Sequence, residues 1–269
     1  MDGNVLFAFA LTLFAGLATG IGSLLAFFTK RTNTRFLSIA LGFSAGVMIY
    51  VSLVEIFVKA KDELVIQLGA SNGYWMTLVG FFGGMLLIAI IDYFIPAIGN
   101  PHDVKSVEEV DAGPTNDEYA KLKRMGMFTA LAIAIHNFPE GIATFTSALQ
   151  DPTLGIAIAI AVAIHNIPEG IAVAIPIYFA TGNRKQAFKL SFLSGLAEPV
   201  GAIVAYLILM PYLNGVMFGV IFAAVAGIMV FISIDELLPA AQKYDEAHLS
   251  IYGMMAGMAV MAVSLVLIV

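Results

Sequence analysis

Long apolar segments separated by short polar ones dominate the pattern of this chain. Eight such runs lie near residues 4–28, 36–58, 74–98, 125–149, 153–180, 190–210, 214–239 and 249–269. A helix needs about 20 apolar residues to cross the hydrocarbon core of a bilayer, and each run approaches or exceeds that length. The pattern predicts an all-α integral membrane protein with eight transmembrane helices, in which residues 1–269 form a single transmembrane domain.

The positions of Lys and Arg predict the orientation. Eleven of the 13 basic residues follow the first, third, fifth or seventh run, and only Lys59 and Lys61 lie in the other connections. Lys and Arg are retained on the cytoplasmic side of a membrane. We therefore expect both termini outside, and we expect Gly99–Leu122, with its prolines and acidic cluster, to be a flexible cytoplasmic loop.

Composition narrows the class of protein further. Apolar residues make up 60% of the chain and charged residues 12%, which nearly excludes an ordinary soluble domain. The chain has no cysteine, so disulfides and thiolate metal sites are excluded. The net charge of −6 argues against a nucleic acid partner, and the lipid bilayer of the cell (inner) membrane is the expected surrounding of a multi-pass chain.

An octapeptide occurs twice. His136-Asn-Phe-Pro-Glu-Gly-Ile-Ala143 and His165-Asn-Ile-Pro-Glu-Gly-Ile-Ala172 differ at one position. The two copies lie near the middle of consecutive runs joined by a short loop, so the two helices must be antiparallel. Two copies on antiparallel membrane helices are related by a pseudo-two-fold axis in the membrane plane, which defines an inverted repeat.

A fainter repeat flanks this pair. Gly16–Phe27 in the first run aligns with Gly195–Tyr206 in the sixth, and Ala45–Glu55 in the second aligns with Ala226–Glu236 in the seventh. These alignments predict a 3+2+3 arrangement of helices. The alternative is a chance alignment of small residues, which are common where membrane helices touch.

Acidic and imidazole groups inside the runs are the candidate chemistry. They are Glu55, Asp92, His136, Glu140, His165, Glu169, Glu198, Asp235 and Glu236, and no Lys or Arg lies among them. An ionised carboxylate at the bilayer centre costs several kcal/mol by itself. Glu140, Glu169 and Glu198 therefore require a cation, a proton or both.

Helical spacing groups the residues of each octapeptide. His136, Asn137 and Glu140 share one face because residues three and four apart are neighbours, and His165, Asn166 and Glu169 repeat this arrangement. Pro139 and Pro168 are expected to kink their helices and release backbone oxygens there. Glu198, followed by Pro199, can contribute from the sixth run.

These donor types indicate the metal. Imidazole, carboxylate and amide oxygen together suit Zn²⁺, Fe²⁺, Mn²⁺ or Co²⁺. The candidate ligands exceed the needs of one tetrahedral ion, so we predict two adjacent metals bridged by Glu140 and Glu169; the set is His136, Asn137, Glu140, His165, Asn166, Glu169 and Glu198.

Other interpretations of these residues stay open. Glu198 could be a protonated, hydrogen-bonded acid. Glu55, Asp235 and Glu236 lie nearer the ends of their runs and are either residues of a metal pathway or interfacial carboxylates, and Asp92 could likewise be solvated at the interface. His102 and His248 have the character of surface histidines.

At this point the motifs resemble a known family. The paired His-Asn-x-Pro-Glu-Gly-Ile-Ala motifs, the eight runs, the loop after the third run and Ser233-Ile-Asp-Glu-Leu-Leu-Pro239 are similar to those of the ZIP (Zrt/Irt-like protein) metal transporters. The resemblance implies uptake of zinc, with iron, manganese, cobalt and cadmium as further substrates and no resident cofactor, and an elevator-like shift of one helix bundle against another. It places His136, Glu140, His165 and Glu169 around one ion, and Asn137, Glu140, Asn166, Glu169 and Glu198 around the second. Many members carry a His-rich cytoplasmic loop, but Gly99–Leu122 holds only His102, so we expect no metal-sensing role for it.

The leading hypothesis is a carrier rather than an enzyme. A divalent metal would be accepted near Glu55, held at the paired motifs and released past Asp235 and Glu236. A passive metal channel is the alternative. A membrane metalloenzyme is less favoured because the Glu-x-x-His and His-Glu-x-x-His motifs of di-iron bundles and zinc proteases do not occur. A second copy of the chain, in a homodimer, is a candidate partner besides the metal ions and the bilayer.

Overall fold

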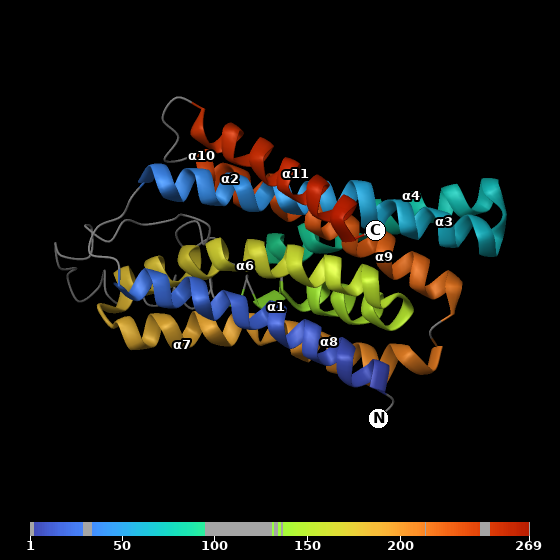
Figure 1. Ribbon diagram of the computed structural model, residues 1–269, viewed down its shortest axis with the longest axis horizontal. Coiled ribbons are helices and arrows are strands. Elements are labelled where there is room, and N and C mark those ends of the chain that lie inside the picture. The colour runs from blue at the N-terminus through green and yellow to red at the C-terminus, as the bar shows by residue number, and fades with distance from the viewer. Residues whose placement is uncertain are drawn as a thin grey trace.

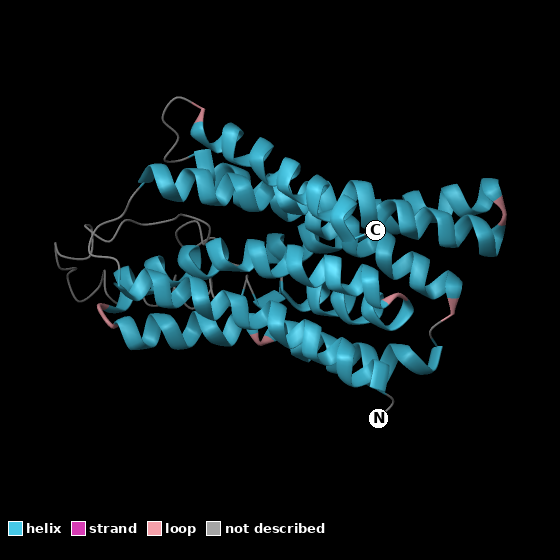
Figure 2. Ribbon diagram, in the orientation of Figure 1, coloured by secondary structure: helices cyan, strands magenta, loops and turns pink. Residues whose placement is uncertain are grey.

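The computed structural model describes residues 3–28, 34–94, 131, 134–135, 137–212, 214–242 and 248–268. Within these residues the secondary structure is helical and contains no strand (Figure 2). The helices are α1 (Gly3–Phe28), α2 (Thr34–Tyr50), α3 (Phe57–Leu68), α4 (Ala70–Phe94), α6 (Pro152–Thr181), α7 (Arg184–Gly195), α8 (Ala197–Val204), α9 (Gly215–Ile232), α10 (Leu238–Gln242) and α11 (Leu249–Ile268). Residues 137–150 form a further helix.

Short π-helical and 3₁₀ segments extend several of these helices. The π-helical η1 (Val51–Ile56) joins α2 to α3, and the π-helical η5 (Ser233–Leu237) joins α9 to α10. The π-helical η3 (Ala205–Leu209) and the 3₁₀ turn η4 (Met210–Tyr212) continue α8. The α-helical segments joined in this way form longer continuous helices.

In the described residues, seven helices, counted together with the segments that continue them, are long and apolar enough to cross a membrane. They are Gly3–Leu24, Arg35–Leu68, Ala70–Tyr93, Pro152–Ile175, Arg184–Tyr212, Gly215–Gln242 and Leu249–Leu267. They match seven of the eight predicted runs, and residues 137–150 cover the end of the remaining one, whose first part lies outside the described residues. The predicted loop Gly99–Leu122 also lies outside them. The all-helical architecture of an integral membrane protein is thus confirmed for the described part of the chain.

The second span is longer than predicted. We expected it to end near residue 58, with Lys59 and Lys61 in a loop, but α3 continues to Leu68. Lys59 lies one helical turn from Glu55, with its Nζ 4.0 Å from Glu55 Oε1, and Lys61 Nζ lies 2.9 Å from Asp62 Oδ1. The apolar side of α3 is buried at Ala60 and Leu64. Charged side chains interrupt the apolar run here without interrupting the helix, because they occupy its more exposed side.

Local sequence explains how the two motif-bearing helices are connected. Asp151 is the N-cap of α6, and its side chain accepts hydrogen bonds from the backbone N–H groups of Thr153 and Leu154. Pro152 occupies the first helical position, where its missing N–H has no cost. Gly155 packs so closely on Ala148 that a Cβ there would overlap it. The tight turn fixes helix 137–150 and α6 as neighbours.

The helices form two bundles. The first bundle consists of helix 137–150, α1, α6, α7 and α8, with α1 lying along α6 and α7; the second consists of α2, α3, α4, α9, α10 and α11, with α2 along α11 and α4 along α9 (Figure 1). Contacts of α2 with α6 join the bundles. The beginning of α1 and the end of α11 lie toward the same end of the molecule (Figure 1).

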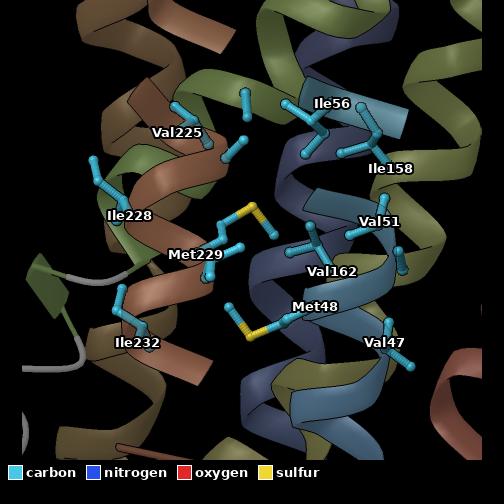
Figure 3. Close-up of a cluster of buried hydrophobic side chains, with 14 of the residues drawn as sticks. Val47, Met48, Val51, Ile56, Ile158, Val162, Val225, Ile228, Met229 and Ile232 are labelled. Atoms are coloured by element: carbon cyan, nitrogen blue, oxygen red, sulfur yellow. The ribbon is translucent and has the colours of Figure 1, made fainter. Parts of the chain in front are cut away.

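Apolar side chains fill the junction between the bundles. Met48 and Val51 of α2 and η1, Val162 of α6, and Met229 and Val225 of α9 belong to one buried cluster, and the side chains of Met48 and Met229 both reach into the space between α2 and α9 (Figure 3). Neighbouring lipid is as apolar as these side chains, so close packing rather than expulsion from water holds such a junction together.

Backbone contacts in the first bundle occur in equivalent pairs. A Cβ on Gly16 would meet the backbone oxygen of Gly195, and a Cβ on Gly195 would meet that of Gly16, each at 2.5 Å. Gly22 is packed on the backbone oxygen of Ile167 in the same way that Gly201 is packed on that of Phe138. These four glycines occupy aligned positions of the first and sixth runs, so the aligned residues of these two runs make equivalent contacts in space.

Candidate metal centre

Six of the seven predicted ligands lie in the described residues, and all six are buried. Asn137 and Glu140 lie on helix 137–150, His165, Asn166 and Glu169 on α6, and Glu198 in the first turn of α8. Each is between 0% and 2% exposed. The seventh, His136, lies outside the described residues. Burial of so many polar groups in a membrane-spanning bundle is costly and marks a functional site by default.

His165 lies beside two carboxylates. Its Nε2 is 3.2 Å from both carboxylate oxygens of Glu140 and 3.9 Å from Oε1 of Glu169. Glu169 is one turn further along α6, whereas Glu140 comes from the other motif helix. An imidazole nitrogen and two carboxylates from two helices thus converge in the interior; the spacing along α6 accounts for His165 and Glu169, and the packing of the two helices brings in Glu140.

The two asparagines are held in equivalent orientations. Asn137 Nδ2 donates to the backbone oxygen of Ser194 at 3.3 Å, and Asn166 Nδ2 donates to that of Ala15 at 2.9 Å. Because a backbone oxygen can only accept, the amide nitrogen must face it and Oδ1 must point away. Neither Oδ1 has a hydrogen-bond partner within the described part of the chain. Each amide oxygen is therefore oriented as a potential metal ligand.

Glu198 joins the site through Asn166. Asn166 Nδ2 donates a short hydrogen bond to Glu198 Oε1 in addition to its bond with Ala15. One amide thus connects α1, α6 and α8. Glu198 of the sixth span therefore lies beside a motif residue, and its contribution to metal binding stays a prediction.

The motif glycines have a packing role that the sequence interpretation overlooked. A Cβ on Gly141 would collide with the backbone of Glu198, and one on Gly170 would collide with the backbone oxygen of Thr19. Thr19 and Glu198 are aligned in the fainter repeat, so these are again equivalent contacts. The only signal in the sequence was that each glycine directly follows a motif glutamate. Close approach here brings α1 and α8 next to the ligands.

Neither motif proline breaks the part of the helix that the structure describes. α6 runs as one α-helix from Pro152 to Thr181 through Pro168, and helix 137–150 contains Pro139. Ser44 on α2 donates from Oγ to the backbone oxygen of His165 at 3.4 Å. This bond links the second bundle to a motif residue, and no sequence pattern had singled out Ser44.

The predicted pathway residues lie apart from these ligands, in the second bundle. Glu55 belongs to η1 and Asp235 and Glu236 to η5, while Asp92 lies near the end of α4. The Glu55 side chain is 22% exposed, Glu236 is half-buried and Asp235 is exposed. The π-helical segments η1 and η5 therefore carry an acidic residue, Glu55 and Glu236, at aligned positions. π-Bulges are frequent at functional sites. His248, beside the beginning of α11, is exposed, as predicted.

The arrangement suits a divalent metal. In the described residues no group of three or more His, Asp and Glu side chains is already arranged as a complete ligand set. Imidazole, carboxylate and oriented amide oxygen nevertheless meet between two helices, and such donors match Zn²⁺ and related ions.

Comparison with known proteins establishes the class. The family model described as ZIP Zinc transporter matches residues 97–265, which is more than half of the chain. The chain therefore belongs to the ZIP family of zinc transporters. It is a multi-pass cell-membrane protein and, like the family, a transporter rather than an enzyme, as predicted.

Similar proteins narrow the relationship within the family. The zinc transporter ZupT of Lysinibacillus sphaericus is 76% identical over 269 residues, covering 100% of both chains. That of Oceanobacillus iheyensis is 70% identical over 265 residues, covering 98% of this chain and 99% of the relative, and that of Streptococcus mutans is 60% identical over 269 residues, covering 100% of both. Among ZIP proteins the motifs of this chain most resemble bacterial ZupT, and these full-length similarities agree.

Proposed function

We propose that this protein carries Zn²⁺ into the cytoplasm through a binuclear centre on helix 137–150 and α6. The observation that carries this proposal is the meeting of His165, Glu140 and Glu169 in the buried interior, beside two asparagines whose amide oxygens face away from the backbone. Metal ions here are substrate, and Fe²⁺, Mn²⁺, Co²⁺ and Cd²⁺ are proposed as further substrates because they accept the same donors.

Two metal positions account for the ligand set. His136, Glu140, His165 and Glu169 are proposed around one ion, and Asn137, Glu140, Asn166, Glu169 and Glu198 around the other. The contacts among the described residues support this division, since His165 lies against Glu140 while Asn166 pairs with Glu198. The charges of the bridging glutamates offset those of the two dications at the point where the bilayer would otherwise disfavour them.

The division of the molecule into bundles supports alternating access. All six described candidate ligands lie in the first bundle, whereas Glu55, Asp235 and Glu236 lie in the second. An elevator-like shift of the first bundle could therefore carry the whole centre past the second. The equivalent contacts of Gly16 with Gly195 and of Gly22 and Gly201 support the proposed 3+2+3 inverted repeat across residues 1–269.

The proposed orientation places both termini outside. The distribution of basic residues supports this orientation, since Arg35 lies in the first turn of α2, Arg184, Lys185 and Lys189 lie on α7, and Lys59 and Lys61 lie at the other end of the second span, on α3. The metal would then approach from the side of Glu55 and leave past Asp235 and Glu236 toward the cytoplasm.

Reconstitution tests this function. The purified protein in proteoliposomes should take up Zn²⁺ with a rate that saturates with concentration, and unlabelled zinc inside the vesicles should accelerate uptake of labelled zinc. A flux that rises linearly without saturation would support a passive channel instead. If equilibrium dialysis showed that the purified protein retains no Zn²⁺, the proposed site would be rejected.

A further inference from the structure

The inverted repeat relates two residues that differ in chemistry. Asn166 on α6 donates to the backbone oxygen of Ala15, and Asn137 on the other motif helix donates to that of Ser194. Ala15 and Ser194 each precede the glycine that begins one copy of the fainter repeat. Gly170 is packed on Thr19 just as Gly141 is packed on Glu198. The same symmetry therefore exchanges Thr19 and Glu198.

The side chains of Thr19 and Glu198 leave their helices at equivalent places. Glu198 Cβ lies beside Gly16, at 3.4 Å from the position that a Cβ on Gly16 would take. Thr19 lies beside Gly195, with its Oγ1 at 2.9 Å from the corresponding position. Glu198 continues past Gly16 to reach the amide of Asn166. By the same symmetry Asn137 is the counterpart of Asn166, and the side chain of Thr19 is two atoms shorter than that of Glu198.

The hydroxyl of Thr19 is unusual for a threonine in a helix. Thr19 is 0% exposed, and its Oγ1 has no hydrogen-bond partner within the residues that the structure describes. A buried hydroxyl ordinarily finds such a partner, and leaving one without it is costly. Thr12, seven residues earlier on the same helix and also 0% exposed, donates its hydroxyl to the backbone oxygen of Ala8 at 2.9 Å. The helix can therefore satisfy a buried threonine, but it does not do so at position 19.

We propose that Thr19 sets the affinity of the metal centre, by presenting a neutral hydroxyl to the transported dication where the symmetry of the fold would supply a second Glu198. This inference rests on the proposed function. Three carboxylates, from Glu140, Glu169 and Glu198, then face two dications, so the pair of ions is not fully neutralised. The ion beside the asparagines is held less tightly than four carboxylates would hold it, which suits a site that must release its cargo.

Substitutions of Thr19 distinguish the effect of an added charge on zinc binding from the effect of a longer side chain. Binding of Zn²⁺ to the purified protein is titrated against a competing chelator. The affinity of the more weakly bound of the two classes of ions, proposed to lie beside the asparagines, is followed. Thr19→Glu should tighten that class by about tenfold or more, because it adds a charge close to the ion in a poorly solvated site. Thr19→Gln, of the same length but neutral, should not. Thr19→Glu should also slow zinc uptake into proteoliposomes, because a more tightly held ion is released more slowly.

Removal of the hydroxyl gives a second, independent test. Thr19→Val should weaken the same class of ions by roughly threefold to tenfold, as expected for the loss of one polar contact, and Thr19→Ser should restore it. Thr12→Val is the matched control and should leave both classes unchanged. Equal affinities for Thr19→Glu and Thr19→Gln would overturn the proposal. If Thr19→Glu does not fold, judged by size-exclusion chromatography, Thr19→Val decides, and the proposal fails if this variant binds like Thr12→Val. Absence of zinc binding by the unaltered protein would reject the proposed function instead.

Discussion

The amide of Asn166 donates from one nitrogen to both the carboxylate of Glu198 and the backbone oxygen of Ala15. A single side chain on α6 therefore fixes α1 and α8 against the helix that carries His165 and Glu169. The amide oxygen is turned away from both acceptors and has no hydrogen-bond partner in the described part of the chain, which is consistent with its proposed role as a metal ligand.

Replacing Asn166 should therefore affect both stability and transport. Asn166→Leu removes both hydrogen bonds and leaves the buried oxygen of Ala15 without this donor, so we expect a loss of about 1–3 kcal/mol in stability and a strong fall in zinc uptake. Thermal unfolding in detergent and uptake into proteoliposomes measure the two effects. Asn183→Ala, at the exposed cap of α7, should reduce uptake little, because its side chain binds only the N–H groups of Lys185 and Gln186. If the two variants lost zinc uptake to the same extent, this role for Asn166 would be contradicted.

Glu140 is expected to be essential for transport. Glu140→Ala removes a carboxylate that lies 3.2 Å from His165 Nε2 and is proposed to bridge both ions, so uptake should fall by about 100-fold or more while the protein stays folded in the membrane. The matched control is Glu63→Ala on α3, whose carboxylate accepts from Gln67 Nε2 at 3.0 Å, far from the motifs in the sequence. Full transport by Glu140→Ala would reject the assignment of the site.

Gly170 should not tolerate a side chain. Gly170→Ala would place a Cβ against the backbone oxygen of Thr19, and relief of this overlap would push α1 away from α6. We expect a cost of about 1–3 kcal/mol, together with weaker zinc binding. Gly83→Ala in α4 is the control, since nothing lies within 4 Å of its added Cβ and a helical alanine is favourable. Thermal stability in detergent compares the two, and a Gly170→Ala variant as stable as Gly83→Ala would contradict the close approach.

Zinc binding should weaken in acid. Carboxylate and imidazole ligands must lose their protons before they bind a metal ion, so protons compete with Zn²⁺ and apparent affinity falls as the pH is lowered. Titration of purified protein with Zn²⁺ between about pH 7.5 and 5.5 measures this dependence. Binding that stays constant across this range would argue against His165 as a ligand. Thermal unfolding without metal, followed over the same range, separates competition from acid unfolding.

The local parts of the fold follow from residue type. Lengths of apolar sequence are sufficient to predict the spans, because a helix in lipid must satisfy its own backbone hydrogen bonds. The end of the second span was predicted poorly because Lys59, Lys61 and Asp62 interrupt the apolar run, although α3 continues through them with Ala60 and Leu64 buried. Hydropathy does not separate a charged exposed side of a helix from a loop.

The sequence by itself determined the helical class and the positions of His165, Asn166 and Glu169 on one face, since spacing along a single helix fixes which side chains are neighbours. The tertiary structure decided how the two motifs face each other, how Asn137 and Asn166 are oriented by backbone oxygens, and how Thr19 and Glu198 pack on the motif glycines. These relationships depend on how closely helices distant in the sequence approach, and that distance is set by packing of small residues on backbone atoms from both sides.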